Sequence, residues 1–189
     1  MFEDLIELDK QLFIYLNGMG VPFWDSFWLY LSKTLSFVTI PIFLFLIYYL
    51  YLKLGFKKAV VAIITVGLLL LCTDQLSVFI KQGTQRLRPC YDNEIQELMR
   101  MVRSYCGGRY SYFSAHAANS FALASFFSIL YKKETKVLGF ALLIWAALVS
   151  YSRIYIGVHF PLDVITGIGV GILFGWLFAK LCESTLEKI

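Results

Sequence analysis

Two long apolar segments of the chain are joined by the stretch Ser152-Arg153-Ile154-Tyr155-Ile156-Gly157-Val158-His159-Phe160-Pro161-Leu162-Asp163. It places a cation, an imidazole and a carboxylate in an otherwise hydrophobic region, and charged groups at a membrane boundary are costly and usually have a task. Pro161 favours the first turn of a helix, where its missing N–H is not needed. We therefore expect His159 just before a helix and Asp163 in its first turn, where the carboxylate could accept the imidazole N–H and fix the tautomer.

The composition predicts an integral membrane protein. Of 189 residues, 59% are hydrophobic, and the mean hydropathy is +0.68. We expect an all-α fold, namely a helical bundle of five to six transmembrane helices with an N-terminal amphipathic helix and an interfacial loop helix. The length allows one domain, 1–189, with interfacial helices in 1–33 and the bundle in 35–182. The net charge of +4 is small and the basic residues are scattered, which argues against a nucleic-acid partner.

Helical periodicity and breaks outline the predicted elements. In residues 3–18, one helical face carries Leu5, Leu8, Leu12 and Tyr15, which predicts an amphipathic helix lying on the membrane. Residues 23–33 resemble a second interfacial helix. Spans are predicted over about 35–52, 59–80, 115–131, 137–151 and 161–182.

The last predicted span carries a glycine at every fourth position: Gly167, Gly171 and Gly175. Such a smooth ridge allows close contact with another helix. Asp163 lies one turn before Gly167 on the same face, so we expect its side chain to point into the bundle as well.

The polar stretch 81–113 is the longest outside the spans. Its apolar residues Ile95, Leu98, Met99 and Val102 recur on one helical face after a possible N-cap at Asp92, which predicts a short interfacial helix.

Two cysteines, Cys90 and Cys106, bracket this loop, whereas Cys72 and Cys182 fall in apolar windows and are interpreted as packing residues. The loop cysteines could form a disulfide if the loop is extracytoplasmic, or remain unpaired thiols. They form no CxxC pattern, which argues against a metal site.

Charge distribution predicts the orientation. With five spans, the basic residues at 53–58, 132–136 and 180–188 share one side, and they slightly outnumber those of the other side once three motif cations are set aside. The positive-inside rule then places the polar loop and the 152–160 turn outside the cytoplasm.

Three polar clusters fall on this outer side: 81–89, 114–116 and 152–163. They supply the cations Lys81, Arg88 and Arg153, together with both histidines of the chain, and Ser114 with the N–H groups of Ala115 and His116 adds a helix N-terminus. Cations and a helix N-terminus suit a phosphate dianion and its transition state.

The remaining groups suit acid–base and nucleophilic chemistry. His159 backed by Asp163 has the character of an activated nucleophile, and His116 could protonate a leaving oxygen. No carboxylate cluster suits Mg²⁺ and no three-ligand set suits Zn²⁺, so we expect neither a metal nor another cofactor.

At these residues the sequence resembles the type-2 phosphatidic acid phosphatase family, the lipid phosphate phosphatases. The family pattern Lys-X6-Arg-Pro is complete at 81–89, and Ser-Arg-X5-His-X3-Asp is complete at 152–163. The central Pro-Ser-Gly-His pattern departs as Phe113-Ser114-Ala115-His116. Alanine disfavours positive φ, but it costs nothing if the N–H groups are presented from ordinary helical φ.

The resemblance implies a metal-independent phosphatase with a phosphohistidine at His159. In this scheme Asp163 orients the nucleophile and His116 acts as acid and base. The phosphoryl oxygens would be held by Lys81, Arg88, Ser114, Ala115 and Arg153.

Three further polar residues are candidates for supporting roles. Arg86 lies two residues from Arg88. Ser152 could take part or only bond to the backbone. Asp74 lies two turns before Lys81 on one face, and either supports Lys81 or a neighbouring helix, or is a hydrogen-bonded packing residue.

The function hypothesis is a lipid phosphatase acting on undecaprenyl diphosphate or a phospholipid phosphate, at the outer face of a bacterial inner membrane. The alternatives are a phosphatase for lipid A or phosphatidylglycerol phosphate, a lipid phosphotransferase using the same phosphohistidine, and a non-enzymatic lipid-binding protein. The expected partners are the lipid phosphate and membrane lipids, and the oligomeric state is unknown from the sequence.

Overall fold

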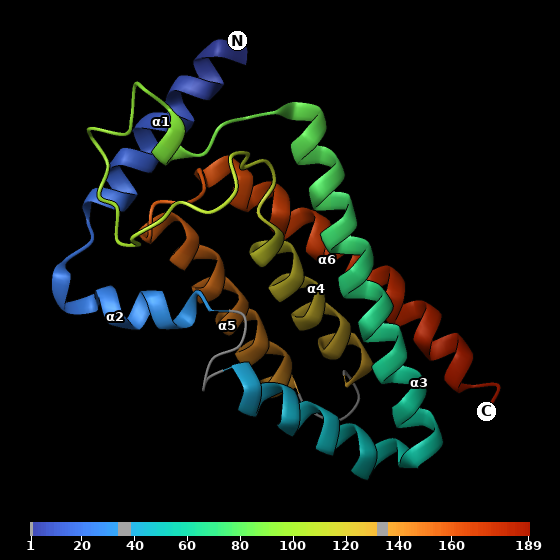
Figure 1. Cartoon of the computed structure of the whole chain (residues 1–189). Coiled ribbons are helices and arrows are strands. Elements are labelled where there is room, and N and C mark those ends of the chain that lie inside the picture. Colours follow the sequence, from blue (N-terminus) through green and yellow to red (C-terminus); the bar gives the residue numbers. More distant parts are fainter. Residues whose placement is uncertain (1, 34–38, 132–135) are drawn as a thin grey trace.

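The computed structural model describes residues 2–33, 39–131 and 136–189, and in these ranges the fold is an all-α membrane bundle (Figure 1). The start of the first predicted span and most of the basic loop at 132–136 lie outside them. The helices are α1 (Phe2–Gly18), α2 (Pro22–Leu31), α3 (Thr39–Thr84), α4 (Ala115–Leu130), α5 (Lys136–Tyr155) and α6 (Pro161–Leu186), with one 3-10 turn, η1 (Pro89–Tyr91).

Helix α3 carries both of the first two predicted spans. Its 46 residues would reach roughly 70 Å if straight, about twice the thickness of a bilayer core. A kink at Gly55, with φ of +74°, divides it into two arms that diverge in Figure 1. The expected basic loop between the two spans is therefore reduced to this kink.

Three helices of the described chain are long and apolar enough to cross a membrane: α3, α5 and α6. Helix α4 is apolar but has 16 residues. It lies between α5 and α6 and is largely buried, and its apolar residues form much of the core with those of α3 and α5 (Figure 1).

The glycine ridge of α6 packs against α4, as predicted. A Cβ added at Gly167 would lie 2.6 Å from the carbonyl oxygen of Ser114, and one at Gly175 would lie 2.5 Å from that of Ala122. The two backbones are therefore close enough that no side chain fits between them. This contact fixes the start of α4 beside the start of α6.

The N-terminal helices α1 and α2 lie at the end of the bundle where α6 begins (Figure 1). Helix α1 is amphipathic, and the predicted apolar face is exposed: Leu5 45%, Leu8 60%, Leu12 41% and Tyr15 66%. Its opposite face packs against the protein. Helix α2 is held to α5 by Asp25, whose carboxylate accepts from the Tyr155 hydroxyl at 2.9 Å and pairs with Arg100 at 2.5 Å.

The polar loop 85–114 differs from the prediction in its secondary structure. The regular interfacial helix is absent from the described chain here; η1 is followed by hydrogen-bonded turns over 92–99. Asp92 still caps these turns, accepting from the N–H of Glu94 at 3.0 Å. Cys90 and Cys106 form the disulfide, with Cα atoms 6.3 Å apart. The loop therefore owes its shape to a cross-link and turns.

Candidate active site

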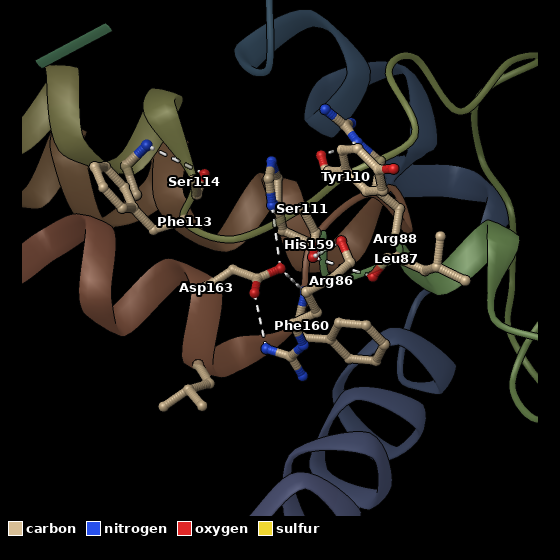
Figure 2. Close-up of polar contacts among 12 residues, drawn as sticks. Arg86, Leu87, Arg88, Tyr110, Ser111, Phe113, Ser114, His159, Phe160 and Asp163 are labelled. Carbon is tan, nitrogen blue, oxygen red and sulfur yellow. Dashed lines mark hydrogen bonds and ion pairs between the residues drawn. The ribbon is translucent and has the colours of Figure 1, made fainter. Parts of the chain in front are cut away.

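The predicted site residues converge where α3 ends and where α4 and α6 begin, beneath the polar loop. The α5–α6 turn contributes His159, and Figure 2 shows its imidazole with one nitrogen toward Asp163 and the other pointing away from that carboxylate. Gly157, with φ of +83°, closes this turn, and a Cβ there would lie 3.2 Å from the carbonyl oxygen of Arg100. Helix α6 starts at Pro161, as predicted.

The predicted His159–Asp163 pair is present and fully buried. The Nδ1 atom of His159 lies 3.3 Å from Oδ2 of Asp163, and the same oxygen accepts the N–H of Phe160 at 3.0 Å. A carboxylate opposite Nδ1 favours the tautomer with the proton there, which leaves a lone pair on Nε2. Burial lowers the pKa of His159 well below its usual value, and the nearby cations Arg88, Arg153 and Lys81 lower it further. The imidazole is therefore neutral near pH 7.

Arg86, a candidate for a supporting role, forms ion pairs with two buried carboxylates. Its Nη1 donates to Asp163 Oδ1 at 2.8 Å, and its Nη2 to Asp9 Oδ2 at 2.5 Å. The guanidinium also stacks 4.3 Å from the centroid of the Phe160 ring. Both oxygens of Asp163 are thus engaged, one by the imidazole and one by Arg86 (Figure 2).

The start of α4 supplies the expected helix N-terminus. Ser114 is its N-cap, and its hydroxyl accepts from the N–H of Ala117 at 3.4 Å. The N–H of Ser114 donates to the carbonyl of Asp163 at 3.0 Å, which ties this helix start to that of α6. Ala115 is helical and is not among the positive-φ residues of the described chain. The alanine therefore fits this position without backbone strain.

The three predicted cations surround both histidines. Lys81, Arg88 and Arg153 all act electrostatically on His116 and on His159. Arg88 is held by the loop, with Nη1 donating to the carbonyl of Cys106 at 3.0 Å. Burial lowers the pKa of Arg88, with further lowering from Arg103, whereas Asp163 raises it. Arg153 donates through Nη1 to the carbonyl of Ser32, the residue that follows α2, while its buried Nε has no partner in the described structure.

Two cavities meet at His116. A cavity of about 740 Å³ lies between α2, residues 102–105 and the end of α5, and the cationic side chains of Lys33, Arg103 and Arg153 form part of its wall. A narrower cavity of about 220 Å³ runs between α3, α4 and α5, lined mainly by apolar residues such as Leu70, Leu123 and Trp145. Lys33 borders both. A headgroup could occupy the first cavity while a hydrocarbon chain enters the second.

Asp74 and Ser152 have structural contacts. Asp74 accepts from Asn119 Nδ2 on α4 at 2.9 Å, which supports the neighbouring helix, and it borders the apolar cavity. The Ser152 hydroxyl donates to the carbonyl of Val149 at 2.6 Å. Of the two roles considered for Ser152, the structure therefore shows the hydrogen bond to the backbone. Among the described residues, no cluster of three acidic, histidine or cysteine side chains could hold a metal ion.

Sequence reasoning missed Asp9, the acidic residue that pairs with Arg86. Asp9 falls outside the apolar face predicted for residues 3–18, where a charged side chain on a membrane-surface helix is expected to be solvated, yet it is 5% exposed. The available signal was its spacing: Asp9, Phe13 and Asn17 recur every fourth residue, opposite the apolar face. Burial raises the pKa of Asp9, although hydrogen bonds from Arg86 and Leu162 oppose this.

The buried histidine–carboxylate pair lies near three cations, and the second histidine lines both an apolar cavity and a cavity with charged walls, an arrangement that suits the phosphate group of a membrane lipid. The chain belongs to the PAP2 superfamily, whose family model matches residues 58–184. Two lipid A 4'-phosphatases are similar over almost the whole chain. The one from Bacteroides thetaiotaomicron is 34% identical over all of this chain and 83% of its own length. The one from Porphyromonas gingivalis is 37% identical over 95% of this chain and 75% of its own.

Further similarities agree with this family. An undecaprenyl-diphosphatase of Sulfolobus acidocaldarius is 43% identical, but over 42% of this chain and 38% of its own. The crystal structure of Aquifex aeolicus LpxE matches with a TM-score of 0.66 and 26% identity, covering 90% of this chain and 93% of that one. A transmembrane PAP2-type phosphatidylglycerolphosphate phosphatase from Bacillus subtilis matches in fold, with a TM-score of 0.73, 18% identity and coverage of 96% and 87%. The protein is a lipid phosphatase of this membrane family.

Proposed function

We propose that this protein hydrolyses a phosphate monoester of a lipid A-like glycolipid. The reaction passes through a phosphohistidine at His159 and needs no metal. The similarity to two lipid A 4'-phosphatases over 95% or more of the chain supports this substrate. The sequence-based preference for undecaprenyl diphosphate has weaker support, because that relative matches less than half of the chain. A large cavity with cationic side chains in its wall, beside a smaller apolar cavity, suits a phosphorylated saccharide headgroup that carries acyl chains.

The observation that carries the mechanism is the buried His159–Asp163 pair at 3.3 Å. In the first step, Nε2 of His159 attacks phosphorus, and the bond from phosphorus to the sugar oxygen breaks. His116 gives its proton to that oxygen, which leaves as a hydroxyl group. Asp163 stabilises the positive charge that develops on His159.

In the second step, His116 takes a proton from water, and the resulting hydroxide attacks the phosphohistidine. The nitrogen–phosphorus bond breaks, inorganic phosphate is released, and neutral His159 is regenerated. In this proposal Lys81, Arg88 and Arg153, with the N–H groups at the start of α4, hold the phosphoryl oxygens in both steps.

We further place the site at the outer face of a bacterial inner membrane. The disulfide between Cys90 and Cys106 lies in the loop above the site, and disulfides persist mainly in oxidising compartments. The orientation predicted from loop lysines agrees with this placement.

The substrate test compares phosphate release from lipid A, undecaprenyl diphosphate and phosphatidylglycerol phosphate by purified protein in detergent with EDTA. We expect lipid A to be the fastest substrate by at least about tenfold in kcat/KM, which is roughly 1.4 kcal/mol of transition-state binding. Mass spectrometry should locate the lost phosphate on the distal sugar. Faster turnover of undecaprenyl diphosphate would reject the substrate, and a requirement for divalent metal would reject the mechanism.

The two histidines can be separated with an activated aryl phosphate, whose leaving group needs no proton. His116→Asn should then form the phosphoenzyme and hydrolyse it slowly, whereas His159→Asn should form none. Acid-labile label on the protein, measured after rapid quenching, distinguishes the two. Label retained in His159→Asn would exclude this histidine as the nucleophile.

A further inference from the structure

One face of α1 lies against the turn that carries His159. Its residues Asp9, Phe13 and Asn17 are four positions apart and therefore lie along a single stripe of the helix. They are 5%, 0% and 0% exposed, in contrast to the lipid-facing leucines of the same helix. The stripe combines a carboxylate, an aromatic ring and an amide in one buried contact.

Asp9 binds the beginning of α6. Its Oδ1 accepts the N–H of Leu162 at 2.8 Å, which satisfies a free donor in the first turn. Its Oδ2 pairs with Arg86, the same guanidinium that pairs with Asp163. A continuous chain of polar contacts therefore runs from Asp9 through Arg86 and Asp163 to His159.

Asn17 binds the end of α5, on the other side of the turn. Its Nδ2 donates to the carbonyls of Ile154 at 3.1 Å and Tyr155 at 2.9 Å, and its Oδ1 accepts from the N–H of Arg100 at 2.7 Å. These carbonyls belong to the last residues of α5, where regular helical donors run out, although the Ile154 carbonyl also accepts the N–H of Gly157 at 3.0 Å. Asn17 thus fixes where the turn begins, as Asp9 fixes where it ends.

Phe13 contacts the turn between these two polar anchors. Its ring centroid lies 5.3 Å from that of Phe160, the residue after His159, in an edge-on arrangement. The Phe160 ring also contacts the Arg86 guanidinium, whose central carbon lies 4.3 Å from the ring centroid. The side chain next to His159 is therefore held by both α1 and Arg86.

We propose that Asp9 and Asn17 are positioning residues for catalysis, which makes α1 part of the machinery that aims His159; this rests on the proposed role of His159. Neither side chain contacts the imidazole. Asp9 acts through Arg86 on the carboxylate, and Asn17 acts through the carbonyls of α5 on the turn. Together they set the direction of Nε2, on which the geometry of attack depends.

The test measures kcat and KM separately for purified Asp9→Asn with lipid A as the substrate. Asparagine keeps an oxygen that can accept from Leu162, so the variant removes mainly the ion pair with Arg86. We expect kcat to fall about 10- to 100-fold, the range known for partners that orient a functional histidine. KM should stay within about threefold, because α1 does not line the two cavities at His116.

Two comparisons separate positioning from general destabilisation. Glu7→Gln makes the same charge change on the exposed face of α1 and should leave kcat unchanged. Asp9→Asn added to Arg86→Gln should lower kcat little further, because Asp9 acts through that arginine. Full additivity of the two changes, an equal loss in Glu7→Gln, or a loss confined to KM would each overturn the proposal.

Each variant is compared at equal amounts of folded protein, judged by thermal unfolding in detergent. If Asp9→Asn does not fold, the kcat of Asn17→Ser and Phe13→Leu decides: a loss at constant KM supports the proposal, and unchanged kcat in both rejects it. An inactive wild-type protein, or an active His159→Asn, would instead reject the proposed function. Unchanged kcat in Asp9→Asn with an active wild type rejects only the role of α1.

Discussion

Replacing Gly171 by alanine should force helices α4 and α6 apart. The added Cβ would overlap the carbonyl oxygen of Ala118 and would lie 3.0 Å from both the Ala122 nitrogen and the Phe121 Cβ. Backbone atoms cannot rotate aside, so the helices must separate by about 1 Å to reach ordinary contact distances. The change is one methyl group, placed some distance from the histidines.

Both stability and activity should respond. Overpacking of this kind costs about 1–3 kcal/mol, and the better helix propensity of alanine returns about 1 kcal/mol of that. The Ser114 N–H to Asp163 carbonyl bond, at 3.0 Å, joins the two helix starts and would lengthen. A shift of about 1 Å in catalytic groups can lower the rate about 100-fold.

Gly169→Ala is the matched control, because a Cβ at Gly169 meets nothing within 4 Å. This variant should keep full activity and gain up to about 1 kcal/mol of stability. Thermal unfolding in detergent and phosphate release from lipid A measure the two quantities. If Gly171→Ala proves as stable and as active as Gly169→Ala, the close contact of α4 and α6 is not what aligns the site.

Three further outcomes are expected. Because the pKa of His159 lies well below its usual 6.5, the nucleophile stays neutral as the pH falls, so the loss of kcat/KM on acidification should set in only below pH 6.5; an acid-side loss centred at or above that value would contradict the burial of the imidazole. Replacing Cys90 and Cys106 by serine should lower the free energy of unfolding by about 3 kcal/mol, measured by thermal unfolding, and reducing the disulfide of the wild-type protein should lower it by the same amount. Asp74→Asn should keep phosphate release within about threefold, since asparagine can still accept from Asn119; a loss of about 100-fold would show that this carboxylate serves the site.

Much of the site followed from sequence because its determinants are local. Pro161 and the spacing of His159 and Asp163 fix the geometry across one helix start, where an acidic residue at the third position accepts the N-cap N–H. The glycine ridge was likewise visible as a four-residue repeat. Such features depend on neighbours along the chain, so periodicity and turn chemistry are sufficient to predict them.

The features that sequence did not predict depend on contacts between distant segments. Asp9 lies 77 residues from Arg86, and no local pattern indicates that the two meet. The loop helix was predicted from the apolar spacing at 95–102, but Ile95 is buried against Phe13 and Met99 by tertiary packing in a turn, so the same residues fill the core without a regular helix. A short loop was predicted from the lysines at 53, 57 and 58, but the helix continues on both sides of Gly55, and the chain changes direction at that single residue.

The spacing of Gly167, Gly171 and Gly175 has a consequence for how the enzyme assembles. Successive glycines are separated along α6 by about 6 Å, and a Cβ at any of the three would meet a backbone carbonyl oxygen of Ser114, Ala118 or Ala122. The two helices can meet this closely only where a glycine faces each of these carbonyls, so sliding α6 along α4 would place larger side chains at the same contacts. The position of α6 along α4 is thereby fixed, and the start of α4 stays beside Asp163, whose carbonyl accepts the N–H of Ser114, when the two helices assemble in the membrane.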